Sequence, residues 1–171
     1  MPTTTRARAS APTIFDEAYA AVAADPRCRD LATGIRSHAV EVACLARELA
    51  PLVDADPGDA FAAGLLHDIG QLLLLRRDPD GYPTLLGGGL AHGDQLRREK
   101  ALYRTDHALL AAEYLLDRRV ADAIADAVAD HHDPFVSSAG TTVVVSAADE
   151  LLGTDETRRR SVRMLDGTHG A

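Results

Sequence analysis

The stretch that decides the fold is FAAGLLHDIGQLLLL, residues 61–75. Its apolar residues predict a buried helix, yet His67 and Asp68 interrupt the run in its middle. A buried imidazole or carboxylate without a partner costs several kcal/mol, so both side chains need partners inside the protein. Metal ions would be such partners. The alternative is a helix end with an ordinary polar pair, which is the usual origin of an isolated His-Asp dipeptide.

Further imidazoles and one carboxylate lie at or beside the buried faces of other predicted helices. His38 is upstream, and His107, the pair His131-His132 and Asp149 are downstream. Imidazoles and carboxylates together suit zinc, iron, manganese or nickel better than calcium. The sequence therefore predicts a site for a divalent transition metal.

Two stretches of the chain carry a resemblance to known proteins. GLLHDIG, with a histidine on the preceding helix and an aspartate on a late helix, resembles the HD superfamily of metal-dependent phosphohydrolases. TDHALLAAEYLLDRRVADAIADAVADHHDP is similar, in order and spacing, to the C-terminal half of HDOD signalling domains. The resemblance runs from about Ser37 to Leu152. It implies an all-α, HD-domain-like bundle of about six to seven helices.

The resemblance also implies a centre for one or two metal ions. By analogy with HD enzymes, one ion would be held by His38, His67, Asp68 and Asp149, and a second by Asp68, as a bridge, with His107, His131 and His132. Two cations polarise a phosphoryl group and acidify the water between them, so that the water can attack at neutral pH. Asp68 and Gln71 are the candidate catalytic residues.

Two positions depart from the pattern of active HD enzymes. Gly34 stands one helical turn before His38, where the related HD-GYP phosphodiesterases have a glutamate ligand. Gln71 stands where many active HD enzymes have the lysine of HDIGK, and Lys100 is the only lysine in the chain. Glutamine can hydrogen-bond a phosphate oxygen, but it carries no positive charge and is a poor proton donor. Both departures weigh against catalysis.

Three interpretations of the histidines compete. The first is a metal-dependent phosphohydrolase that acts on a nucleotide or a phosphodiester, which the complete ligand set favours. The second is a noncatalytic HDOD-like signalling or scaffolding module that retains the metal site. Because the segment before Leu31 is too short to be the N-terminal half of an HDOD domain, a homodimer or a protein partner would cover the exposed face. The third is a set of ordinary core histidines without metal, which would leave many buried polar groups unsatisfied.

Composition narrows the class of protein. The 171 residues suffice for one domain with a proper core, and only 4% of them are aromatic. A core of Leu, Ala, Val and Ile favours packed helices. The formal charge of −8 is spread along the chain and argues against a nonspecific nucleic-acid surface, although a metal-held phosphate ester remains compatible with it.

Several features predict a cytoplasmic protein. Cys28 and Cys44 do not form a CxxC pair and are expected to be ordinary thiols. The N-terminal MPTTTRARASAPT lacks the apolar segment of a secretory signal. No apolar run approaches the ~20 residues of a membrane span.

The composition along the chain also predicts its division into a disordered N-terminus, one domain and a C-terminal tail. Residues 1–12 are expected to be disordered, residues 13–152 to form the HD/HDOD-like domain, and residues 153–171 to form a polar tail or a loose helix. Thr13 is expected to cap the first helix, 78–92 to form a loop, and 120–132 to form one amphipathic helix. The stretch TTVVVSAADELL has high β-propensity, but the family resemblance predicts a helix with Asp149 facing the core.

Overall fold

The computed structural model describes residues 9–166 with the exception of 89, 91, 134 and 136–138. These described residues form helices, turns and bends, with no strand among them. The elements are α1 (Ala11–Ala23), α2 (Arg29–Leu49), the 3-10 helix η1 (Ala50–Val53), α3 (Pro57–Leu66), α4 (Ile69–Arg77), α5 (Gly81–Leu86), α6 (His92–Tyr103), α7 (His107–Asp117), α8 (Asp122–Ala129) and α9 (Gly140–Asp166). The all-α prediction is confirmed, with more helices than expected.

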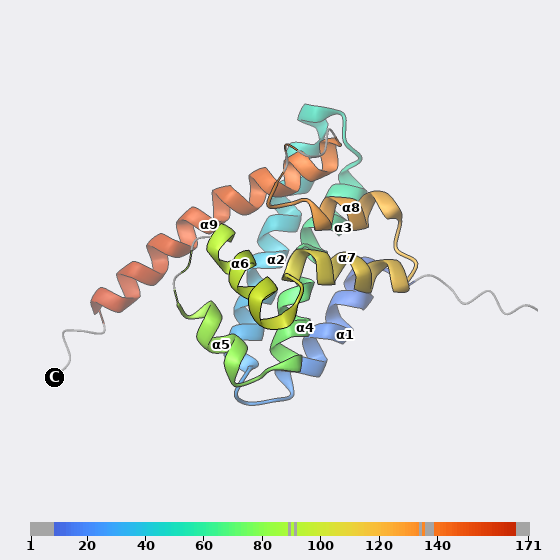
Figure 1. Cartoon of the computed structure of the whole chain (residues 1–171). Helices are drawn as coiled ribbons and strands as arrows, with labels where there is room; N and C mark the ends of the chain where they lie inside the picture. The colour runs from blue at the N-terminus through green and yellow to red at the C-terminus, as the bar shows by residue number, and fades with distance from the viewer. Residues whose placement is uncertain (1–8, 89, 91, 134, 136–138, 167–171) are drawn as a thin grey trace, which may run out of the picture.

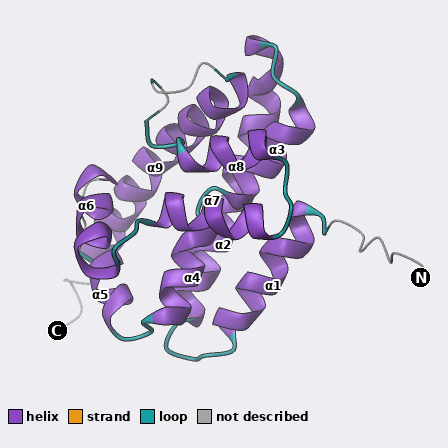
Figure 2. Ribbon diagram, turned by 45° about the vertical axis from the view of Figure 1, so that its right-hand side comes forward, coloured by secondary structure: helices purple, strands orange, loops and turns teal. Residues whose placement is uncertain are grey.

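The helices pack around α2, which runs through the middle of the molecule (Figure 1). Helix α2 lies along α3 on one side and is crossed by the first part of α9. Helix α4 packs between α1 and α7, and α8 packs on α7 and α3 (Figure 2). Of the disordered N-terminus that the sequence predicts, residues 1–8 lie outside the described residues. Helix α9 continues beyond Gly153, the position from which a polar tail or a loose helix is expected.

Within the described residues, no helix has both the length and the apolar character needed to cross a membrane.

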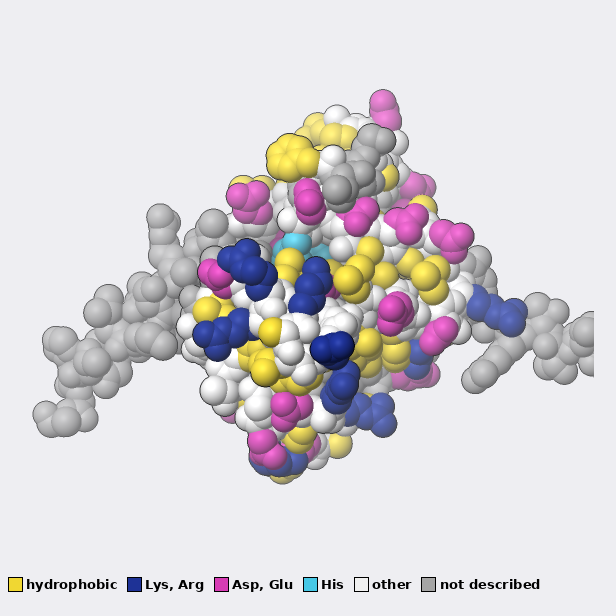
Figure 3. Space-filling view, viewed as in Figure 1, with side chains coloured by type: hydrophobic (Ala, Val, Ile, Leu, Met, Phe, Trp, Pro, Cys, Tyr) yellow, Lys and Arg dark blue, Asp and Glu magenta, His cyan; other side chains and the backbone are white. Residues whose placement is uncertain are grey.

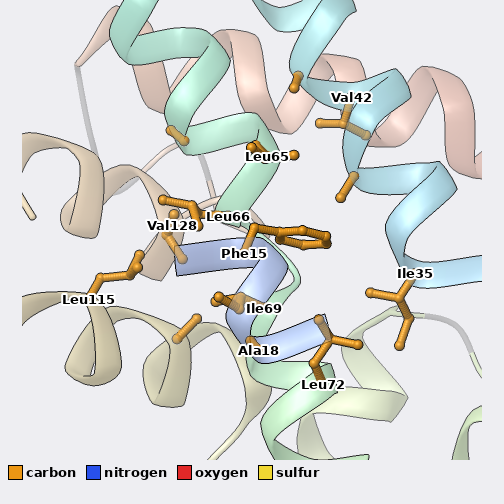
Figure 4. Close-up of a cluster of buried hydrophobic side chains, with 14 of the residues drawn as sticks. Phe15, Ala18, Ile35, Val42, Leu65, Leu66, Ile69, Leu72, Leu115 and Val128 are labelled. Carbon is orange, nitrogen blue, oxygen red and sulfur yellow. The ribbon is translucent and has the colours of Figure 1, made fainter. Parts of the chain in front are cut away.

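Aliphatic side chains fill the space between these helices. Figure 4 shows side chains from six helices turned toward a shared interior, among them Phe15, Ala18, Ile35, Val42, Leu65, Leu66, Ile69, Leu72, Leu115 and Val128. Alanines on α2 complete the packing against α3, because Ala39, Ala43 and Ala46 are fully buried. A Cβ on Gly64 would lie 2.8 Å from Cα of Ala43, so the two backbones meet more closely than any larger residue permits.

Side-chain caps explain where several helices begin. The Oδ1 atom of Asp56 accepts hydrogen bonds from the N–H groups of Gly58 and Asp59 at 2.7 and 2.9 Å, so α3 begins at Pro57. Helix α7 is capped in the same way, because the carboxylate of Asp106 accepts a hydrogen bond from the N–H of Leu109 at 2.8 Å. The predicted cap at Thr13 is wrong, because the hydroxyl of Ser10 takes that role and α1 begins at Ala11.

The expectation of a loop over 78–92 is also wrong, because this stretch contains α5. The carboxylate of Asp78 accepts from the N–H of Gly81 at 2.8 Å and starts the helix. Tyr82 is fully buried and fixes α5 to the body of the protein. Helix α8 ends at Ala129, earlier than predicted, so His131 and His132 lie in the turn that follows it.

A break in the central apolar run positions His67 and Asp68. Helix α3 ends at Leu66 and α4 begins at Ile69, so the two polar residues form the bend between them. Directly after the bend, α4 touches the start of α7, because a Cβ on Gly70 would lie 1.9 Å from the carbonyl oxygen of His107. Glycine at this position therefore brings the bend against His107.

We expect Gly70→Ala to lower the free energy of unfolding by about 3 kcal/mol, because its methyl group would overlap the backbone of His107. Gly34→Ala is the matched control, since a Cβ there meets nothing within 4 Å and α2 would gain up to about 1 kcal/mol. Urea denaturation followed by circular dichroism measures both changes. Equal stability of the two variants would show that α4 and α7 do not meet this closely.

Candidate metal centre

All seven candidate ligands converge on one place from distant parts of the chain. The contributing segments are α2 (His38), the bend before α4 (His67, Asp68), the start of α7 (His107), the turn after α8 (His131, His132) and α9 (Asp149). The ring centroids of His67 and His131 are 5.1 Å apart, and those of His107 and His132 are 5.0 Å apart. Histidine side chains reach the surface at one small area of the face in Figure 3.

The seven residues form three overlapping groups with the spacing of metal ligands. The groups are His38, His67 and Asp149; His67, Asp68 and His131; and His107, His131 and His132. Within each group the potential ligand atoms lie within 4.8 Å of one another. Ligands on opposite sides of an ion are about 4.2 Å apart, twice the usual ion–ligand distance of about 2.1 Å, so small movements suffice. Two of these groups fall within the sets that the resemblance to HD enzymes implies, and the third combines His67 of one set with His131 of the other. The role of these residues as ligands stays a prediction.

Asp68 links the two ends of the cluster. Its Oδ2 atom lies 3.3 Å from Nε2 of His67, and its Oδ1 atom lies 3.3 Å from Nε2 of His107. At the first end, Nε2 of His38 and Oδ1 of Asp149 are 2.9 Å apart, and the same oxygen is 3.7 Å from Nε2 of His67. Each oxygen of Asp68 thus faces a different histidine, as a carboxylate bridging two ions would.

Backbone carbonyls orient two of the central imidazoles. His67 donates Nδ1–H to the carbonyl of Gly64 at 2.7 Å, and His131 donates Nδ1–H to the carbonyl of Val128 at 2.6 Å. In the neutral form of each ring this leaves a lone pair on the buried Nε2, and neither Nε2 has a hydrogen-bond partner among the described residues. A buried polar atom without a partner is costly, and a metal-ligating imidazole usually has its other ring nitrogen fixed by a hydrogen bond of this kind. The two imidazoles, and the cluster around them, therefore fit a bound metal ion.

The electrostatics of the cluster favour an added cation. Burial opposes protonation of His67, yet Asp68 and Asp149 raise its pKa to about 9, so at neutral pH this ring carries a proton that a bound metal ion would displace. Burial, reinforced by His67 and His107, lowers the pKa of His131 to about 4, which keeps that imidazole neutral. Burial also opposes ionisation of Asp68, but the imidazoles of His67, His107 and His38 hold its pKa well below the usual range. Ionised carboxylates beside a neutral imidazole are the combination that binds transition metals.

A second carboxylate, which the sequence patterns did not reveal, supports His107 from behind. Glu99 is fully buried, and its Oε2 atom accepts from both the backbone N–H and Nδ1 of His107 at 2.8 Å. Its Oε1 atom accepts from the hydroxyl of Tyr82 at 2.8 Å and from the amide of Gln95 at 2.9 Å. With Nδ1 held in this way, Nε2 of His107 is directed toward Asp68 and lies 2.9 Å from Nε2 of His132.

A pattern on α6 could have revealed Glu99. Leu96, Glu99 and Tyr103 recur at the spacing of one helix face, and Glu99 and Tyr103 are buried. A glutamate on the inner face of an amphipathic helix needs a buried partner. Exposed basic neighbours on the same helix conceal this pattern in the sequence.

The two positions that differ from the pattern of active HD enzymes each lie about one helical turn from a candidate ligand along the chain. Gln71 is half-buried in the first turn of α4, and its N–H donates to the carbonyl of Asp68 at 2.9 Å. Its catalytic role stays a prediction. Gly34 is exposed on α2 one turn before His38, and the space beside it is open.

We expect Glu99→Gln to weaken metal binding by about 10–100-fold, because His107 would lose the carboxylate that orients its ring and raises its basicity. Glu113→Gln is the matched control, since it removes an exposed carboxylate from α7, the helix that carries His107. Calorimetric titration with Mn²⁺ measures the affinity, and circular dichroism confirms folding. An unchanged affinity in Glu99→Gln would contradict the supporting role.

Comparison with known proteins agrees with this architecture. The model of the HDOD domain family matches residues 17–134. The fold is similar to a crystal structure from Shewanella amazonensis SB2B described as "Putative phosphohydrolase", with a TM-score of 0.64, 23% sequence identity and 71% of this chain covered. The chain spans 46% of that protein, and at this identity the likeness shows the fold alone. No curated protein matches the chain. The match to two thirds of the chain and the helical HD-like fold together show that this chain belongs to the HDOD domain family.

Proposed function

We propose that the protein is a metal-dependent phosphohydrolase that acts on a nucleotide or a phosphodiester. The observation that carries the proposal is the pair of orphaned Nε2 atoms, on His67 and His131, in a cluster through which Asp68 connects His67 to His107. Iron, manganese, zinc and nickel all suit these ligands. The description of the Shewanella protein is consistent with this chemistry.

In this proposal, seven residues would bind the metal ions and Glu99 would orient one of these residues. A pair of bound ions supplies Lewis acidity toward the phosphoryl group and a lowered pKa of water. His38, His67, Asp68 and Asp149 would hold one ion, and Asp68 with His107, His131 and His132 would hold the other. Glu99 keeps His107 in place through two hydrogen bonds of 2.8 Å.

Gln71 has a distinct part in this proposal. It lies in the first turn of α4, three residues after Asp68, and its amide would donate a hydrogen bond to a phosphate oxygen. An amide supplies no proton to the departing oxygen. We therefore expect esters with good leaving groups, such as nitrophenol, to be hydrolysed faster than alkyl esters.

A noncatalytic role is the second candidate, and membership of the HDOD family together with Gln71 and Gly34 favours it. In that case the metal would join the helices of a signalling or scaffolding module. A second copy of the chain or a protein partner would then bind its surface. Under either candidate we place the protein in the cytoplasm, since Cys28 and Cys44 are both free thiols.

The deciding experiment begins with the metal content of protein purified without chelator. We expect at least one ion per chain and hydrolysis of bis(4-nitrophenyl) phosphate, nucleotides or cyclic dinucleotides. Asp68→Asn should abolish turnover, because the connection between the two ends of the cluster loses its charge. Asp126→Asn, which changes an exposed carboxylate on α8, should have no effect.

Two outcomes would lead to other conclusions. Unchanged turnover in His67→Ala would assign the activity to a contaminant. Bound metal without turnover of any substrate would favour the noncatalytic role, and protein that binds no metal would contradict both candidates.

We also expect Gln71→Lys to raise turnover at least about tenfold, because a lysine could neutralise the phosphate and protonate the leaving group. The measurement is kcat on an alkyl phosphodiester, for which leaving-group protonation matters most. Metal content of the variant serves as the control. A kcat equal to that of the wild type would show that the side chain at this position does not reach the departing oxygen.

A further inference from the structure

Basic side chains gather on the outer side of α6, in a chain that is acidic as a whole. Four of the 18 Lys and Arg residues of the chain fall within positions 97–104. They are Arg97, Arg98, Lys100 and Arg104, which we call the α6 basic surface, and all four are exposed. The proposed hydrolase mechanism uses none of them.

This surface borders the candidate metal centre. Glu99, on the inner side of the same helix, contacts His107 directly. Nζ of Lys100 lies 2.9 Å from Oδ2 of Asp106, the buried residue that caps α7 immediately before His107. Arg104 precedes His107 by three residues, and its N–H donates to the carbonyl of Lys100 at 3.1 Å. In Figure 3, Lys and Arg side chains lie to the left of and below the small area where histidine side chains reach the surface.

The α6 basic surface has more positive charge than its own acidic neighbours neutralise. Arg97 forms an ion pair with Asp94, and Lys100 forms one with Asp106. Arg98 and Arg104 form no ion pair with any residue in the described part of the chain. Two guanidinium groups of the α6 basic surface are therefore not neutralised by an ion pair, and guanidinium groups bind phosphate through paired N–H donors.

A groove along α6 provides room for a ligand. It has a volume of about 610 Å³ and is lined by Leu90, Asp94, Arg97, Arg98, Ala101 and Leu102. Arg98 lines it, whereas Arg104 and the candidate metal-binding residues do not, so the groove would hold a part of the substrate that lies away from the reacting phosphate. Its lining combines two arginines with apolar side chains, which suits a charged group attached to a less polar one.

We propose that the α6 basic surface binds a further phosphate group of the substrate, which is therefore a phosphate ester with at least two phosphate groups. This inference rests on the proposed function, since it specifies the substrate class of the same centre. The metal centre would hold the reacting phosphate, while Arg98 and Arg104 would hold the second. Binding energy from the second phosphate positions the first for attack.

The test is calorimetric titration of the full chain as purified, with inorganic pyrophosphate and orthophosphate as probes. Metal content is measured before and after titration, so that removal of metal by pyrophosphate is detected. We expect pyrophosphate to bind at least about tenfold more tightly than orthophosphate, and Arg98→Gln/Arg104→Gln to weaken pyrophosphate binding by about tenfold. The affinity lost in this variant should be largest at low salt.

Arg118→Gln/Arg119→Gln is the matched control, because it removes the same charge at the far end of α7. Arg104 and Arg119 also share the left-handed backbone conformation, with φ of 67° and 58°, so backbone strain is matched as well. The control should bind pyrophosphate as the wild type does. Equal affinities of the wild type for the two probes, or equal weakening in both double variants, would overturn the inference.

Failure of this inference is distinguishable from failure of the proposed function. Selective pyrophosphate binding in a protein without turnover would contradict the hydrolase alone. Turnover without any preference for pyrophosphate would contradict the role of the α6 basic surface alone.

Discussion

The placement of one ionised carboxylate, Asp68, between two buried imidazoles is the constraint on which the rest of the structure depends. Its two oxygens lie 3.3 Å from Nε2 of His67 and 3.3 Å from Nε2 of His107. A continuous helix would turn His67 and Asp68 about 100° apart, and the bend between α3 and α4 changes this relation. Because Gly64 and Gly70 have no side chain, α2 and α7 can approach the bend closely. Packing of the core and assembly of the site are thus consequences of the same local geometry.

The site also depends on a layer of residues behind the candidate ligands. Carbonyls of Gly64 and Val128 fix the rings of His67 and His131, and the carboxylate of Glu99 fixes His107. Glu99 itself accepts a hydrogen bond from Tyr82, which joins α5 to this layer of supporting residues. Helix α6 therefore has a buried face, from which Glu99 supports His107, and an exposed face that carries basic side chains.

Much of the site could be predicted from the sequence, because family resemblance identifies candidate ligands by their order and spacing. The convergence of His38 and Asp149 could be expected only in this way, since 111 positions separate them and no local pattern links them. Resemblance also overrode the β-propensity of TTVVVSAADELL, which forms part of α9. The missed features depend on tertiary contacts: Glu99 is buried among exposed basic neighbours, and α5 is stabilised by burial of Tyr82. The early end of α8 places His131 and His132 in a turn, which periodicity alone does not predict.

The long separation of His38 and Asp149 has a consequence for how the chain folds. An ion shared by these residues would close a loop of 111 positions, and closing so long a loop removes much of the freedom of the unfolded chain. It would act on stability as a covalent crosslink does, by restricting the unfolded ensemble. Metal supply in the cell would then govern how long α9 stays docked, and through this the lifetime of the folded protein.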